Sequence, residues 1–144
     1  MTPPLIDAEG LSYAYGELRV ADASLKFVVD LSAWRIADYE RQWRDAIDRL
    51  VRGARSTALM TSYRGPGDRP HRMWALWRDE NFVYFQDHIV VPADLDAPFD
   101  PSFPDVHVGA RLAPEQGSPI PEWRIELVHL LATAFGIRWP LYPH

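Results

Sequence analysis

An amphipathic helix pattern, set among short strand-like segments, constrains the fold of this chain more than any other feature. Five apolar residues recur at helical spacing and form one stripe: Tyr39, Trp43, Ile47, Leu50 and Val51. Asp38 lies in the expected first turn, where a negative charge suits the helix dipole. Gly53 gives the expected C-terminal stop. The pattern therefore predicts one main helix over about 37–53.

The segments around this helix have the character of β-strands, because they are short and rich in aromatic and β-branched residues. The expected strands are Leu11–Tyr15 (ended by Gly16), Leu25–Leu31, Thr57–Tyr63, Met73–Trp77 and Phe82–Gln86. Asp79–Asn81 predicts a hairpin turn between the last two. No strand–helix–strand alternation appears. We therefore expect an α+β fold, a single domain over 1–144 with a mostly antiparallel sheet packed against the main helix.

The two ends of the chain are less regular. Glu122–Leu127 alternates strictly between polar and apolar residues and favours a strand. Extended to Phe135, the same region also fits one helix over 121–135. We favour a strand followed by a short C-terminal helix, 128–135, stopped by Gly136. Residues 1–10 are expected to be loose, because prolines near the start block early strand pairing.

Charge is distributed unevenly along the chain. Seven acidic residues and no Lys or Arg lie between Asp79 and Ala110: Asp79, Glu80, Asp87, Asp94, Asp96, Asp100 and Asp105. The whole chain has a net charge of −5, so this segment carries the entire excess. Within it, residues 92–104 contain four prolines and three aspartates. We expect a long, ordered acidic loop there, and loops of that length are often functional.

Motifs for catalysis are weak. The chain has no phosphate-binding Gly-rich loop, no Gly-x-Ser-x-Gly elbow, no His-Glu-x-x-His pair and no cysteine. We therefore expect no enzyme activity, no catalytic residue, no cofactor and no metal. The alternative is a small-ligand-binding, metal-binding or hydrolytic site that uses Asp100, Asp105 and His107. Asp105 and His107 would share one face if this segment were extended.

Nucleic acid and membrane partners are not expected. Residues 35–78 contain ten basic and five acidic residues, but the two signs interleave along the helix, as on a solvated surface. The isoelectric point near 5.4 also argues against a phosphate-binding groove. No apolar run approaches the roughly 18 to 20 residues that span a bilayer. The N-terminus has no signal-peptide pattern, so we expect a cytoplasmic protein.

Six segments between Ala37 and Leu127 follow one another in a characteristic order. They are Glu40–Gly53, Thr57–Tyr63, the hairpin of Trp74–Arg78 and Val83–Gln86, Pro98–Pro101, Val106–Arg111 and Ile120–Trp123. In this order the chain resembles the immunity proteins of bacterial contact-dependent growth inhibition and related polymorphic toxin systems. The resemblance implies a small cytoplasmic protein that binds one cognate toxin domain, frequently a nuclease, and blocks it. It carries over no catalytic residue and does not locate the interface.

Charge complementarity gives the interface prediction instead. Carboxylates on a long loop can mimic phosphate spacing, occupy a basic active-site groove and speed association. Two phenylalanines in the loop would add apolar anchors, unless they tuck under it as a satellite core. The predicted partner-binding residues are Asp94, Asp96, Phe99, Asp100, Phe103 and Asp105. The oligomeric state stays open.

Overall fold

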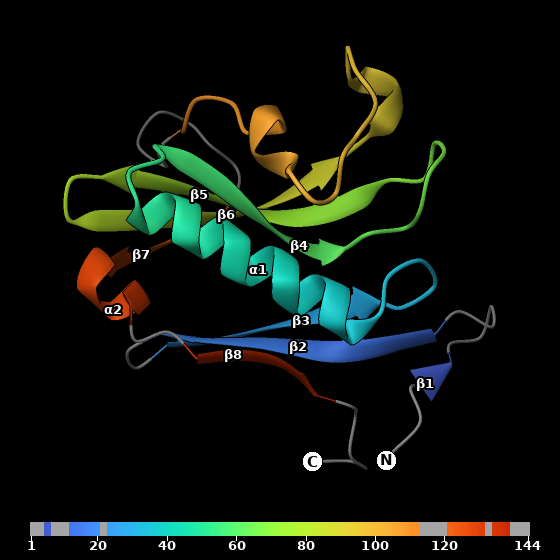
Figure 1. The fold of residues 1–144 in the computed structure, drawn as a ribbon, viewed down its shortest axis with the longest axis horizontal. Helices are drawn as coiled ribbons and strands as arrows, with labels where there is room; N and C mark the ends of the chain where they lie inside the picture. Colours follow the sequence, from blue (N-terminus) through green and yellow to red (C-terminus); the bar gives the residue numbers. More distant parts are fainter. Residues whose placement is uncertain (1–4, 7–11, 21–22, 113–120, 132–133, 139–144) are drawn as a thin grey trace.

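The computed structural model describes residues 5–6, 12–20, 23–112, 121–131 and 134–138 (Figure 1). Within them the chain forms two antiparallel four-stranded sheets around one main helix. Sheet A contains β1 (Leu5–Ile6), β2 (Ser12–Val20), β3 (Ala23–Asp30) and β8 (Ala134–Arg138). Sheet B has the order β4 (Ser56–Ser62), β5 (His71–Asp79), β6 (Phe82–Val90) and β7 (Glu122–Glu126).

Helical segments connect these strands. The main helix α1 (Ile36–Val51) follows β3, and the short helix α2 (Leu127–Leu131) follows β7. Two 3-10 turns, η1 (Pro92–Asp94) and η2 (Pro104–His107), lie between β6 and β7. The α+β class, with one main helix and a short C-terminal helix, is confirmed. The expected single sheet is instead two sheets, and α1 connects β3 of sheet A to β4 of sheet B.

Gly16 does not end a strand as expected, because β2 continues through it to Val20. Gly16 lies opposite Phe27 in the β2–β3 register. A Cβ at position 16 would collide with the ring of Phe27, so the glycine makes room for that ring inside the core. Here glycine is used for a close cross-strand approach and not for a turn.

Both ends of the chain differ from expectation. A strand and then a helix do follow Pro121, but the helix ends at Leu131 and not at Phe135. Residues 134–138 form β8, which pairs with β2 along the edge that β3 leaves free. The long-range pairing overrides the local helix pattern. In the N-terminal segment Leu5–Ile6 is not loose, because it pairs with β2 as β1. The rest of 1–10 lies outside the described residues.

Helix α1 covers the outer edge of β4 with buried polar side chains. Gln42 donates its amide to the carbonyl of Ala58 (2.7 Å) and accepts from the backbone N–H of Met60 (2.7 Å). The indole of Trp43 donates to the carbonyl of Met60 (2.6 Å). Gln42 thus takes the place of a neighbouring strand, satisfying a donor and an acceptor that water cannot reach.

A tyrosine extends this arrangement toward sheet A. The hydroxyl of Tyr39 donates to the carbonyl of Asp30, at the end of β3, and accepts from the backbone N–H of Tyr63 (2.9 Å). Burial is the main cause that raises the pKa of Tyr39 above its ordinary value. This hydroxyl therefore joins the ends of β3 and β4 at the first turns of α1.

The central part of β5 in sheet B is buried on both faces. On the face toward sheet A, Trp74 lies near Phe27 of β3 and against Phe85. On the opposite face, the indole of Trp77 donates to the carbonyl of Gly109 in the connection between β6 and β7 (2.8 Å). In Figure 1 sheet A lies below α1, sheet B lies above it, and the β6–β7 connection lies above sheet B. This burial explains the nearly continuous apolar run of β5.

Aromatic rings form a row at the end of sheet B. Trp34 contacts Tyr63, Tyr63 contacts His71, and His71 stacks on Phe99 at 4.8 Å between ring centroids. His71 is 1% exposed, and its Nδ1 accepts from the backbone N–H of Arg64 (3.0 Å). Burial lowers the pKa of His71 below the ordinary 6.5, and the nearby arginines act in the same direction.

Gln42→Leu is expected to lower the free energy of unfolding by about 2–4 kcal/mol. The substitution leaves the Ala58 carbonyl and the Met60 N–H buried without partners, and each such group costs about 1–3 kcal/mol. Urea unfolding followed by circular dichroism measures the loss. Arg41→Ala, an exposed position on the same helix, serves as the control and should stay within about 0.5 kcal/mol of wild type. Equal stability of Gln42→Leu and the control would contradict the role of Gln42.

Stability should fall as the pH drops below about 6.5. The folded-state pKa of His71 is depressed, so at mildly acidic pH the unfolded chain binds the proton more readily. Burial depresses the pKa of His88 in the same sense. Each group contributes at most about 1.4 kcal/mol per pH unit. Urea midpoints at pH 7.5 and 5.5 test this, and His71→Asn, which removes the titrating group, should show a smaller difference. Identical midpoints for wild type at both values would refute it.

Candidate partner-binding surface

Several side chains of the connection between β6 and β7 point inward and pack against the core. Phe99 is partly buried, stacks on His71 and lies 5.3 Å from the ring of His107. Leu95 and Val108 also pack against the core. The described part of this connection is therefore the cover of sheet B. The sequence allows Phe99 either as an apolar anchor for the partner or as part of a satellite core under the loop. Its ring packs against the core, as the second alternative describes.

Asp105 is also turned inward. Its two carboxylate oxygens accept from the guanidinium of Arg49 on α1, at 2.9 and 3.0 Å, and its side chain is only 11% exposed. This two-point pair joins the η2 turn to the last part of the main helix. Asp105 therefore has its charge matched within the chain.

The Asp100, Asp105 and His107 alternative is not brought together as a site. Asp105 and His107 lie on a 3-10 turn and not on an extended strand face. Asp105 already pairs with Arg49, and the Nε2 atom of His107 is buried without a hydrogen-bond partner. In the described residues, no group of three or more His, Asp or Glu side chains is placed to hold a metal ion.

Three carboxylates in the described part of the connection face solvent: Asp94, Asp96 and Asp100. Asp100 accepts from the backbone N–H of Ser102 (2.9 Å), which shapes the turn and leaves the negative charge in place. In the segments that the structure describes, none of the three forms an ion pair. By contrast, Asp87 on β6 pairs with Arg72 on the neighbouring strand (3.0 Å). Within residues 91–112, the described part of the connection, these three residues thus carry the negative charge that forms no ion pair.

Phe103 lies next to this charge and is 42% exposed. Its backbone N–H donates to the carbonyl of Asp100 (3.1 Å), so the two residues share one turn. The guanidinium of Arg49 lies 4.6 Å from the centroid of its ring. Of the two phenylalanines in the predicted set, this one is presented to solvent.

The far end of the described connection is held by a polar cluster that the sequence did not reveal. Arg111 pairs with Glu122 of β7 and stacks over the ring of Tyr84 at 3.6 Å. Gln86 donates to both Glu122 and the carbonyl of Leu112. The hydrogen bond from Arg111 is the main cause that lowers the pKa of Glu122. Only the β6–β7 pairing brings these groups together.

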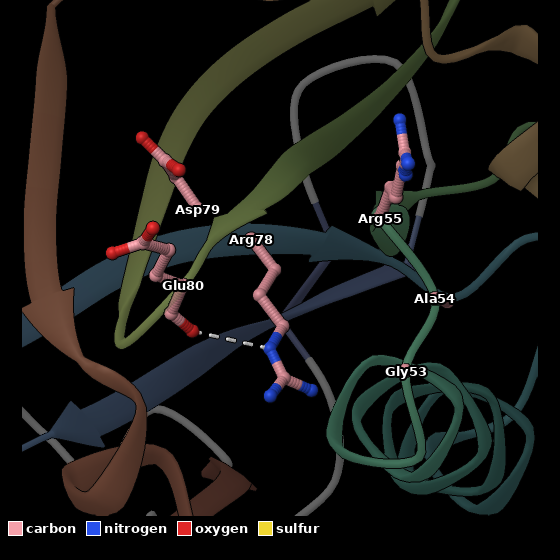
Figure 2. Close-up of a pocket in the computed structure, with 6 residues that line it drawn as sticks. All are labelled: Gly53, Ala54, Arg55, Arg78, Asp79 and Glu80. Carbon is pink, nitrogen blue, oxygen red and sulfur yellow. Dashed lines mark hydrogen bonds between the residues drawn. The ribbon is translucent and has the colours of Figure 1, made fainter.

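Two shallow hollows lie elsewhere on the molecule. One, of about 340 Å³, separates the end of α1 from the β5–β6 hairpin (Figure 2). In it Arg78 donates to the carbonyls of Leu50 and Val51 and so caps the helix. Arg55 extends away from Asp79 and Glu80, whose carboxylates lie on the other side of the view (Figure 2). The other, of about 490 Å³, is lined by Asn81, Phe82, Glu126, Leu127 and Val128. In neither hollow do the lining side chains point toward one common position where a ligand would bind.

No helix among the described residues combines the length and apolar character needed to cross a membrane.

Comparisons with known proteins show which family this chain is related to. No curated protein matches this chain. Among solved structures, a chain of the CdiA-CT/CdiI toxin and immunity complex from Enterobacter cloacae has the same fold, with a TM-score of 0.76 and 22% identity. The match covers 92% of this chain and 90% of that one. Residues 29–133, most of the chain, match the CdiI N-terminal domain. The resemblance to contact-dependent growth inhibition immunity proteins is thus confirmed, and the chain belongs to the CdiI N-terminal domain family.

Proposed function

We propose that this chain is an immunity protein, without enzyme activity of its own, that binds one cognate toxin domain and neutralises it by occluding the toxin's active site. The observation that carries the proposal is the family match over residues 29–133. The likeness of fold to a chain from a toxin and immunity complex is consistent with it. The proposal places the protein in the cytoplasm, where an incoming toxin acts.

The exposed carboxylates support a particular kind of partner surface. Asp94, Asp96 and Asp100 are unmatched within the described residues and lie on a connection that is itself anchored to sheet B. Exposed negative charges held on an anchored connection are complementary to a basic groove, such as one that a nuclease uses for nucleic acid. We therefore propose a nuclease domain as the toxin, with these three residues and Phe103 as contacts.

The remaining two residues of the predicted set receive a different task in this proposal. Phe99 is stacked on His71, and Asp105 is paired with Arg49. Both side chains hold the connection in its observed shape, which keeps the exposed carboxylates in fixed positions. An interface whose groups are ordered before binding loses less entropy when it forms.

Co-expression in bacteria tests the function directly. The toxin domain encoded in the gene directly upstream should stop growth, and this chain should restore growth and elute with that domain as one complex. A nuclease assay of the purified toxin domain, with and without this chain, checks the proposed toxin class and occlusion. If growth stays arrested although this chain is expressed and folded, the proposed immunity role is wrong.

Replacing Asp94, Asp96 and Asp100 together by Asn should reduce the association rate with the toxin domain about 10-fold or more at low salt. Electrostatic steering raises association rates by about 10- to 1,000-fold and disappears as salt screens the charges. Stopped-flow measurements between about 20 and 300 mM salt should show a steep decrease for wild type and a shallow one for the variant.

The control for this experiment is a second triple variant, Asp68→Asn, Asp79→Asn and Glu126→Gln. It removes three exposed carboxylates outside the β6–β7 connection and changes the net charge equally. Its association rate should stay close to that of wild type. If both triple variants slow association equally, net charge is responsible and the connection has no special role.

A further inference from the structure

Two apolar side chains project from the η2 turn. Phe103 precedes the turn and is 42% exposed, and Val106 within it is 67% exposed. Phe103 directly precedes the η2 helix, and Val106 follows it three residues later, which is the length of one 3-10 turn. Between them, Pro104 is buried and Asp105 turns inward. We call Phe103 and Val106 the apolar knob.

A clamp from α1 fixes this knob. The carboxylate of Asp105 accepts two hydrogen bonds from the guanidinium of Arg49, and this two-point contact fixes the plane of the guanidinium. The same guanidinium lies 4.6 Å from the centre of the Phe103 ring, within the range of a cation–π contact. One arginine thus links an inward carboxylate to an outward ring. The positive charge of Arg49 is already matched, so the clamp does not cancel the nearby carboxylates.

The chemistry around the knob indicates what covers it. Asp100 joins Phe103 in one turn, and Asp94 and Asp96 lie earlier in the same connection. An aromatic anchor beside unmatched negative charge fits a protein surface that combines an apolar recess with a basic rim. This is the surface expected of the partner in the proposed function, on which the inference rests.

We propose that Phe103 and Val106 are the apolar anchor of the toxin-binding surface, and that Asp105 is a positioning residue that orients this anchor through Arg49. The acidic residues speed the encounter, whereas the knob sets how long the complex lasts. Asp105 acts on the complex through the Phe103 ring and makes no contact with the partner itself.

A double-mutant cycle with the toxin domain encoded directly upstream tests this division, using the full chain and surface plasmon resonance. Phe103→Ala should raise the dissociation rate by roughly 30-fold, as for an aromatic hot spot, and Val106→Ala by a smaller factor. Asp105→Asn should raise it about 10-fold in the wild-type background. In the Phe103→Ala background, the same change should have an effect of less than about 2-fold.

Matched variants complete the design. Arg49→Lys keeps the charge but lacks the planar fork, so it should behave as Asp105→Asn does. Asp48→Asn breaks the exposed pair with Arg52 on the same helix and should leave both rates unchanged. The salt dependence of association should be intact in every knob and clamp variant. Thermal melting confirms that each variant is folded.

The outcomes separate this inference from the function. If Asp105→Asn accelerates dissociation equally with and without the Phe103 ring, Asp105 only orders the connection and the positioning role is wrong. If wild type binds and both knob variants bind as tightly, the anchor is wrong while the immunity function stands. If wild type itself neither binds nor protects, the proposed function fails and this inference fails with it.

Discussion

The outer edge of β4 is the constraint on which the structure depends. This strand pairs with β5 on one side only, so its other row of backbone groups needs partners in a place that water does not reach. Helix α1 supplies them through the amide of Gln42 and the indole of Trp43. The helix is therefore held by directional bonds as well as by its apolar stripe. Its position in turn fixes where Arg49 meets the β6–β7 connection.

The β6–β7 connection does two jobs with alternating side chains. Its inward residues, among them Phe99 and Pro104, cover the second face of sheet B. Its outward residues carry the unmatched charge and the apolar knob. Because the inward set is anchored to β5 and α1, the outward set needs little further ordering when a partner arrives. A cover of a sheet thus also serves as the candidate binding surface.

Local patterns predicted the parts of the fold that local forces determine. The α1 stripe and the strand runs carry their periodicity in consecutive residues, so they could be located without tertiary information. β8 could not, because Phe135 and Gly136 also fit the end of a helix until β2 offers an edge. The charge of the connection was visible, but the partner of Asp105 was not. Arg49 lies 56 residues earlier and meets it only in the folded chain.

The pairing of strand β2 with segments far apart in the sequence determines the order in which the fold can form. Both β1 and β8 pair along its edge opposite β3, so sheet A joins segments from opposite ends of the chain. Sheet B and α1 come from the continuous stretch between, 36–126. During synthesis on the ribosome, the helix and the whole β6–β7 connection therefore emerge before β8, which also contacts α1. Pairing between distant segments is slow to form, so β8, the last of the described strands to be made, joins β2 only after sheet B and α1 have been synthesised.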